Sequence, residues 1–183
     1  MNLPRLEGQP LRIVVMGVSG CGKSTLSLAL ADYLHLARVD GDDLHLPESI
    51  RKMSAGIALE DADRWPWLDR IGEYLAASDD GDARGRVVAC SALKRAYRDR
   101  IRAHAAGVRF VFLHGDAQTI GQRMADRVGH YMQADLLESQ LRTLEVPAPD
   151  ETDVLHLSIE PPVGALLART LAALALDVPL PTD

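Results

Sequence analysis

The stretch of residues 17–24, G-V-S-G-C-G-K-S, constrains the fold of this chain more than any other segment. It matches the phosphate-binding loop pattern G-x-x-x-x-G-K-[ST] at every fixed position. Residues 11–16 before it form a short run rich in β-branched side chains, and residues 24–35 after it carry leucines at helical spacing. Because this loop works between a strand and the helix that follows it, the order predicts a nucleotide-binding α/β protein.

The chemistry of the loop assigns roles to its residues. Its glycines let the backbone turn tightly, so that main-chain N–H groups surround a phosphate at the positive end of the helix. Lys23 is expected to reach the β- and γ-phosphates of ATP and to act in catalysis, and the Ser24 hydroxyl is expected to ligate Mg²⁺. The predicted nucleotide-binding residues of this segment are Gly17, Val18, Ser19, Gly20, Cys21, Gly22, Lys23, Ser24 and Thr25.

The charge and composition of the 183-residue chain argue against several other kinds of partner. A net charge of -6 disfavours a nucleic-acid surface or an anionic membrane. The two cysteines, Cys21 and Cys90, indicate a reducing compartment without a disulfide framework. The N-terminal segment lacks the apolar core of a signal peptide, and the longest apolar run, residues 165–176, is too short to cross a bilayer. We therefore expect a cytoplasmic enzyme that binds neither nucleic acid nor membrane.

Strand and helix patterns alternate along the chain. Apolar runs at five places predict strands, and the stretches between them predict helices. Such alternation implies a parallel sheet with helices on both faces, in which ligands bind beyond the carboxyl ends of the strands. No stretch is long enough to be an interdomain linker, so residues 1–183 are expected to form a single domain. The expected strands are residues 11–16, 37–39, 86–90, 108–113 and 154–159.

Two carboxylates follow the second expected strand, in the sequence Asp40-Gly41-Asp42. The third and fourth expected strands end without the metal-positioning Asp that nucleotide switches and motors place there. Asp40, directly after the strand, is expected to hold the Mg²⁺ hydration shell, whereas Asp42 is expected to accept a proton from an acceptor hydroxyl. The alternative is that both acids only form a turn, as Asp-Gly pairs often do.

Two arginines mark an expected lid near residues 120–135. Arg123 and Arg127 are four residues apart and therefore share a helix face. A short helical flap with two guanidinium groups would exclude water and neutralise a transferring phosphoryl group. We therefore assign both arginines to nucleotide binding and Arg127 also to catalysis. The alternative is a solvated helix face, in which Asp116 and Asp126 pair with the arginines.

Four further parts of the chain carry more specific sequence than the phosphate loop. They are G-D-D-L-H at residues 41–45, K-M-S-A-G with D-A-D-R-W-P-W-L at 52–56 and 61–68, C-S-A-L-K-R-A-Y-R-D-R-I-R at 90–102, and R-V-G-H-Y-M with L-L-E-S-Q-L-R-T-L-E at 127–132 and 136–145. In this order they resemble the gluconokinase family of short P-loop kinases, which is related to the shikimate kinases. The resemblance covers nearly the whole chain, and D-R-W-P-W-L and C-S-A-L-K are its narrowest segments.

The resemblance implies a fold, an activity and a set of residues. The fold would be a three-layer P-loop kinase fold, with a five-stranded parallel sheet in the order 2-3-1-4-5 and a short helical lid. The activity would be Mg²⁺-dependent transfer of the γ-phosphoryl group of ATP to D-gluconate, which gives 6-phosphogluconate, often in a homodimer. Lys94 is the strongest substrate candidate, because it follows a strand and is one of three lysines in the chain. The implied substrate-binding residues are Asp42, His45, Arg64, Ser91, Lys94 and Arg98.

Two alternatives to this function share much of the same pattern. A related small-molecule kinase, such as a shikimate kinase or another sugar-acid kinase, would carry a similar phosphate loop. A nucleotide-dependent sensor or binding module that has lost transfer activity is the second. The presence of Lys23, Asp42 and Arg127 argues against the sensor, because a binding module has no need of catalytic groups.

Overall fold

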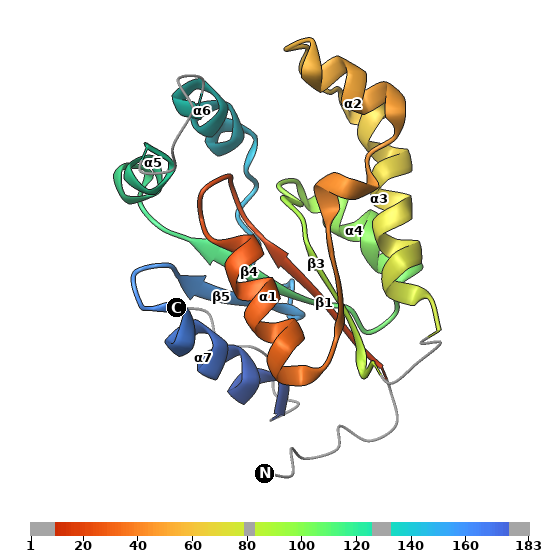
Figure 1. The fold of residues 1–183 in the computed structure, drawn as a ribbon, viewed down its shortest axis with the longest axis vertical. Helices are drawn as coiled ribbons and strands as arrows, with labels where there is room; N and C mark the ends of the chain where they lie inside the picture. Colours follow the sequence, from red (N-terminus) through yellow and green to blue (C-terminus); the bar gives the residue numbers. More distant parts are fainter. Residues whose placement is uncertain (1–9, 79–82, 126–132, 176–183) are drawn as a thin grey trace.

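A computed structural model describes residues 10–78, 83–125 and 133–175 of the chain, in which strands and helices alternate (Figure 1). The strands are β1 (Leu11–Met16), β2 (Ala37–Asp40), β3 (Gly85–Ala89), β4 (Arg109–His114) and β5 (Val154–Ser158). The helices are α1 (Lys23–Leu34), the 3₁₀ helix η1 (Gly41–Leu44), α2 (Pro47–Ser54), α3 (Asp61–Ala76), α4 (Arg95–His104), α5 (Ala117–Ala125), α6 (Gln133–Thr143) and α7 (Val163–Ala175).

The five strands form one parallel sheet in the order β2-β3-β1-β4-β5. This order confirms the predicted fold class. The central strand β1 pairs on both sides, with Val14 opposite Val88 of β3 and opposite Phe110 of β4. Because all the strands run the same way, the phosphate loop after β1 and Asp40 at the end of β2 meet at one edge of the sheet.

Helices cover both faces of the sheet and create three layers (Figure 1). Neighbouring residues of β1 enter separate cores, because successive side chains of a strand point to opposite faces. Ile13 and Val15 pack in the core that includes α1 and α7, whereas Val14 and Met16 pack in the core that includes α3 and α4. Burial on both faces explains why the strands are continuous apolar runs in the sequence.

Two groups of helices flank the phosphate loop at the carboxyl edge of the sheet. Helices α5 and α6 lie on one side of the loop, and α2 with the first turns of α3 lies on the other (Figure 1). The phosphate loop therefore lies between two sets of helices (Figure 1).

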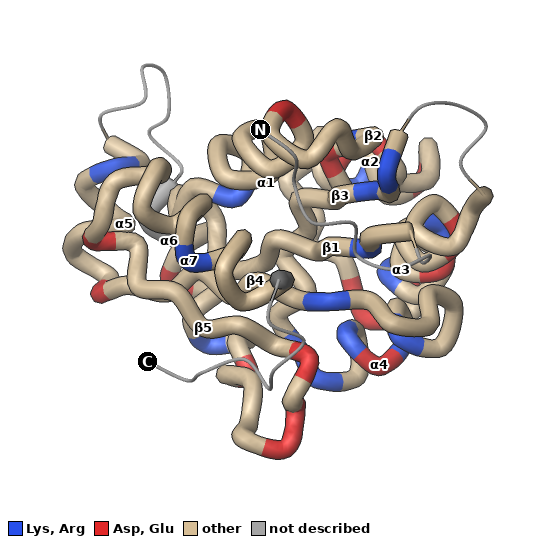
Figure 2. Tube along the Cα trace, turned by 90° about the horizontal axis from the view of Figure 1, so that it is seen from below, with Lys and Arg blue, Asp and Glu red and all other residues tan. Residues whose placement is uncertain are grey.

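Acidic and basic residues are mixed in the described chain. Figure 2 shows them next to each other along α4, and one ion pair joins Arg100 of α4 to Asp69 of α3 at 2.5 Å. The charges of α4 are therefore largely compensated by local partners rather than gathered into a patch of one sign.

Within the described ranges, no helix combines the length and the apolar character that crossing a bilayer requires.

Near the carboxyl edge, one element was not predicted from the sequence, and one predicted segment is described only in part. The D-G-D segment continues into the 3₁₀ helix η1, an element that the sequence patterns did not predict. The expected lid at residues 120–135 is covered only in part, by the end of α5 and the start of α6. Residues 126–132, and with them Arg127, lie outside the described residues.

Candidate active site

The phosphate loop has the backbone conformation that its glycines predict. Gly20 has a φ of 81°, in the left-handed region that favours glycine. A Cβ atom at Gly20 would lie 2.4 Å from Cγ of Met124, so glycine also allows α5 to pack directly on the loop. The Lys23 ammonium group donates a hydrogen bond to the Val18 carbonyl at 2.8 Å, which keeps it beside the loop.

The N-terminus of α1 is built to accept an anion. Its N-cap residue is Gly22, and the described helix has neither a capping side chain nor an acidic residue in its first turn. The first N–H groups of the helix therefore remain available, and the helix dipole adds positive potential at the same point. Phosphate is the anion that this combination of loop and helix binds in other proteins.

Asp40 and Ser24 lie together beside the phosphate loop. The Ser24 hydroxyl donates to Asp40 Oδ2 at 3.1 Å, and the other Asp40 oxygen accepts the Asp42 N–H at 3.3 Å. A hydroxyl and a carboxylate are the oxygen donors that Mg²⁺ prefers, and this ion commonly takes its remaining ligands from phosphates and water. No cluster of three or more His, Cys, Asp or Glu side chains occurs among the residues described. These residues therefore fit Mg²⁺ held jointly with a nucleotide better than a metal bound by protein alone.

Asp42 and His45 are held by a tryptophan beneath them. Asp42 is exposed in η1, and the Trp67 indole N–H donates to the Gly41 carbonyl at 2.6 Å. The His45 ring stacks on Trp67 with centroids 4.4 Å apart and an interplanar angle of 10°. Burial lowers the pKa of His45 below its ordinary value. Trp67 of α3 therefore positions the turn that presents Asp42, and stacking on its ring holds the His45 side chain in place.

The predicted cations Arg64 and Lys94 meet around one carboxylate. Lys94 Nζ lies 2.8 Å from both oxygens of Asp61, which also accepts the Tyr97 hydroxyl. Arg64 lies over the Tyr97 ring at 5.9 Å. Hydrogen bonds from Lys94 and Tyr97 lower the pKa of Asp61, and the Asp61 carboxylate raises the pKa of Lys94. The pair keeps Lys94 charged and directed toward this cluster.

Ser91 and His45 connect the cation cluster to the rest of the site. The Ser91 carbonyl accepts the Gly17 N–H at 3.3 Å, which places the end of β3 against the phosphate loop. The charges of both Asp42 and Arg64 act on His45. The structure thus brings Asp42, His45, Arg64, Ser91 and Lys94 to the β2–β3 side of the carboxyl edge.

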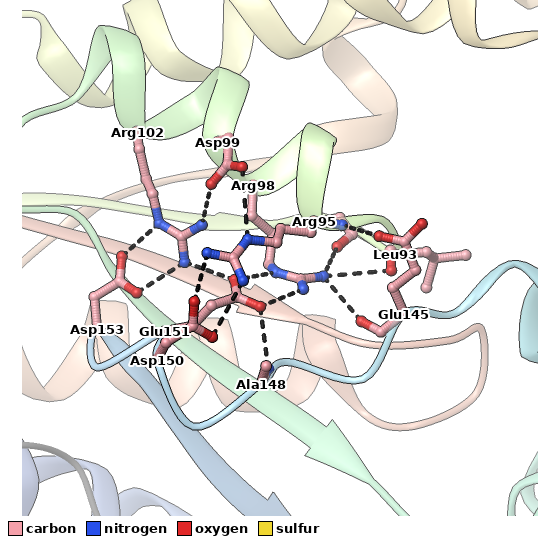
Figure 3. A network of polar contacts seen from close by, with 11 residues as sticks. Leu93, Arg95, Arg98, Asp99, Arg102, Glu145, Ala148, Asp150, Glu151 and Asp153 are labelled. Atoms are coloured by element: carbon pink, nitrogen blue, oxygen red, sulfur yellow. Dashed lines mark hydrogen bonds and ion pairs between the residues drawn. The ribbon is translucent and has the colours of Figure 1, made fainter.

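Arg98 does not belong with the substrate-binding residues, and this expectation was wrong. Its side chain is fully buried, and its guanidinium group pairs with Glu151 at 2.7 and 2.6 Å (Figure 3). It also donates to the carbonyls of Ala92 and Leu93, at 3.2 and 3.3 Å. Arg98 therefore anchors the segment that leads to Lys94, in which Ala92 has a φ of 42°. The amphipathic pattern of α4 could not reveal this, because Glu151 is 53 residues away.

The carboxylate of Glu151 is the centre of a larger network (Figure 3). Arg102 donates to Glu151 at 2.8 Å and to both oxygens of Asp153 at 2.7 and 2.8 Å. Burial raises the pKa of Glu151, but the hydrogen bonds from Arg98 and Arg102 outweigh this effect and lower the pKa to about 2. The network ties α4 to the segment before β5.

A cleft of about 450 Å³ lies on the other side of the phosphate loop. Its walls are residues 20–22 of the loop, the start of α1, Arg123 of α5, residues 159–162 and the first turn of α7. Arg123 donates to the Ile159 carbonyl at 2.8 Å, and its charge also acts on Cys21 of the loop. The structure therefore places Arg123 beside the phosphate loop, whereas Arg127 lies outside the described residues.

The chain is similar to known kinases over most of its length. The sequence model of the adenylylsulphate kinase family matches residues 9–143. The thermoresistant gluconokinase of Escherichia coli K12 is 40% identical over 158 residues, which cover 86% of this chain and 90% of the relative. A crystal structure of a gluconokinase from Sinorhizobium meliloti 1021 is 48% identical with a TM-score of 0.81, covering 91% of this chain and 92% of that chain. The chain belongs to the gluconokinase family.

The likeness of this gluconokinase-family chain to a shikimate kinase is much weaker. The shikimate kinase from Aquifex aeolicus shares 15% identity with a TM-score of 0.56, over 91% of this chain and 98% of that chain. At this identity the likeness shows a common fold alone.

Several positioning residues of the site had no role in the sequence interpretation. Trp67 and Asp61 lie within D-A-D-R-W-P-W-L, and Gln140, whose carboxamide oxygen accepts the Ser19 N–H at 2.6 Å, lies within L-L-E-S-Q-L-R-T-L-E. The narrow match of these segments to the gluconokinase family was the available signal. The resemblance identified the segments, but it did not identify which of their residues face the site.

Proposed function

We propose that this protein is a gluconokinase, which transfers the γ-phosphoryl group of ATP to D-gluconate and yields 6-phosphogluconate. The observation that carries the proposal is the identity of 40% and 48% with two gluconokinases over 86% and 91% of the chain. A phosphate loop beside an exposed carboxylate and a cluster of cations supports it, because gluconate offers a hydroxyl as acceptor and a carboxylate as anion.

On the donor side, residues 17–25 would bind the phosphates of ATP, with Lys23 reaching the β- and γ-phosphates. The cleft of about 450 Å³ between the loop and residues 159–163 would receive the nucleoside. Arg123 would stabilise the phosphates from α5. We propose Arg127 as a second arginine with this role on the strength of the sequence pattern.

Ser24 and Asp40 would hold Mg²⁺, directly or through its water ligands. When bound, the ion would neutralise part of the negative charge of the phosphates. The hydrogen bond of 3.1 Å between Ser24 and Asp40 supports this assignment, because it already brings the two oxygen donors together.

On the acceptor side, Asp42 would orient the terminal hydroxyl of gluconate and accept its proton. The hydroxyl oxygen then forms the new bond to phosphorus while the bond to the leaving ADP breaks, and the proton stays on the Asp42 carboxylate. Arg64 and Lys94 would hold the substrate carboxylate, and His45 and Ser91 would hydrogen-bond its hydroxyls. Lys23 and the lid arginines would stabilise the charge on the transferring group.

An acceptor panel tests the proposed substrate. ADP release would be measured with gluconate, other aldonates, shikimate and adenylyl sulfate under the same conditions. We expect the highest kcat/KM with gluconate, because the site pairs cations with short polar groups. A higher kcat/KM with another acceptor would reject gluconate as the substrate. Tight ATP binding without turnover on any acceptor would instead support a nucleotide-dependent binding module.

Replacing Lys94 by Ala is expected to raise the KM for gluconate by about 10- to 100-fold, because a charge-assisted hydrogen bond is lost. The KM for ATP should stay nearly constant. Arg100→Ala is a matched control, since Arg100 lies on α4 and pairs with Asp69 away from the strand ends. Steady-state kinetics measures both constants, and an unchanged KM for gluconate in a folded Lys94 variant would remove this contact.

We further propose, from the resemblance, that the protein forms a homodimer and works in the cytoplasm. Both cysteines, which lie in the described residues, are unpaired and buried, and this supports a reducing compartment. Light scattering of the purified protein would test the dimer.

A further inference from the structure

The phosphate loop donates a hydrogen bond to a side chain 121 positions away in the sequence. The Ser19 N–H donates to Oε1 of Gln140 in α6 at 2.6 Å. In the part of the chain that the structure describes, the N–H groups of Gly17 and Cys21 donate only to main-chain carbonyls. Gln140 is therefore the described side chain that holds a main-chain N–H group of the loop.

The peptide between Val18 and Ser19 locates this contact. Its carbonyl accepts the Lys23 ammonium group at 2.8 Å, and its N–H donates to Gln140 at 2.6 Å. In a trans peptide the C=O and N–H groups point in opposite directions, so Lys23 and Gln140 bind the same peptide from opposite sides. Because Lys23 reaches the β- and γ-phosphates and contacts this same peptide, Gln140 lies one peptide unit away from the residue that binds these phosphates.

The carboxamide of Gln140 keeps two hydrogen-bond donors. Since an N–H group needs an acceptor, the amide oxygen faces the loop and the amide nitrogen remains as a donor. The nitrogen lies about 2.2 Å from that oxygen in any carboxamide. Among the residues described, none accepts a hydrogen bond from it.

Helix α6 holds Gln140 in this position. Leu137 is buried in the core on the α1 side, and it lies three residues from Gln140 on the same helix face. Just beyond α6, the Glu145 N–H donates to the Leu93 carbonyl at 2.9 Å, and the Glu145 carboxylate accepts the Arg95 N–H at 2.7 Å. The segment therefore contacts the phosphate loop through Gln140 and the residues around Lys94 through Glu145.

We propose that Gln140 is a further catalytic residue, whose amide N–H group donates a hydrogen bond to a γ-phosphoryl oxygen of bound ATP. The proposal rests on the kinase activity proposed above. A donor aimed at this group stabilises the charge that its oxygens carry during transfer, and no bond or proton changes at Gln140 itself. ADP lacks the γ-phosphoryl group, so the contact exists with ATP and not with ADP.

The test compares ATP and ADP binding to the Gln140→Met variant by calorimetry, without an acceptor present. Methionine has a similar length but neither accepts nor donates in the same way. We expect the affinity for ATP to fall by about 10- to 100-fold and the affinity for ADP to change by less than about twofold. Glu138→Gln is the matched control on α6, because Glu138 forms only an exposed pair with Arg142, and both affinities should stay unchanged.

A second variant separates the two roles of Gln140, which are to donate a hydrogen bond through its amide nitrogen and to accept the Ser19 N–H through its amide oxygen. Gln140→Glu still accepts the Ser19 N–H but offers no donor, so it is expected to lose affinity for ATP while it retains ADP. An equal loss of ATP and ADP binding in the Met variant, or no loss of either, would overturn the proposal. The comparison of ATP and ADP affinities needs no acceptor, so it does not depend on the acceptor panel. Failure of the proposed gluconokinase function would appear in that panel instead.

Discussion

Replacing Asp42 by Asn is expected to lower kcat with gluconate by about 10²- to 10⁴-fold, while the affinity for ATP stays nearly unchanged. Asn has almost the same shape, but its amide cannot accept a proton from the hydroxyl of the acceptor. The Trp67 contact with Gly41 should keep the turn in place in the variant, since it does not involve the Asp42 side chain. Steady-state kinetics and ATP binding measure the two effects.

Asp43→Asn is the matched control for this variant. Asp43 lies next to Asp42 in the same 3₁₀ helix and is also exposed, and its replacement is expected to change kcat by less than about twofold. Near-normal turnover of Asp42→Asn would remove its assigned role. Similar losses in both variants would mean that the 3₁₀ helix, rather than the Asp42 carboxylate, is what turnover requires.

Replacing Glu151 by Gln is expected to destabilise the protein by about 3–5 kcal/mol, because it leaves the buried Arg98 guanidinium without a counter-charge. Arg98 is 0% exposed and Glu151 is 6% exposed, so water cannot replace the lost carboxylate. A loss of this size is a large part of the total of about 5–15 kcal/mol that stabilises a typical domain. Urea denaturation measures the change in the free energy of unfolding.

An exposed ion pair gives the control for Glu151. Arg142→Gln breaks the pair with Glu138, whose side chains are 67% and 71% exposed, and is expected to cost less than about 1 kcal/mol. A Glu151→Gln variant as stable as this control would contradict the structural role of the buried network.

The stability of the wild-type protein should also depend on Glu151 at acid pH. Its pKa is lowered from an ordinary value of 4.5 to about 2 in the folded protein. The folded state therefore binds fewer protons than the unfolded state in this range, and the contribution of Glu151 is lost as the pH falls from 4.5 toward 2. The difference between wild type and Glu151→Gln should accordingly be smaller at about pH 3 than at about pH 7, as urea denaturation at both pH values would show. A difference that stays constant with pH would contradict the lowered pKa.

Much of the fold could be predicted from local sequence patterns. The β1 prediction, residues 11–16, matches the structure residue for residue, and the parallel class followed from the alternation of elements. The order of the strands came from the family resemblance and is confirmed. The 3₁₀ helix at Gly41 was missed, because four residues are too few for a periodic pattern to appear.

The candidate site was predicted less evenly. Ser24 and Asp40 were assigned to one metal from loop chemistry and a strand end, and their hydrogen bond of 3.1 Å supports that pairing. Arg98 was assigned to substrate through the family resemblance, whereas its guanidinium turns inward to Glu151. A motif names the residues of a segment, but the direction of each side chain depends on what packs against it.

Local chemistry along the chain was sufficient to predict the phosphate loop of this gluconokinase-family protein, because residues 17–25 form one contiguous segment whose N–H groups, lysine and hydroxyl act over short distances. The acceptor side and the support of the phosphate loop depend on contacts between distant segments. Asp61 meets Lys94 across 33 residues, and Gln140 meets Ser19 across 121. Such pairs form only when the packed helices bring them together, since their energy comes from distance and burial rather than from neighbours in sequence.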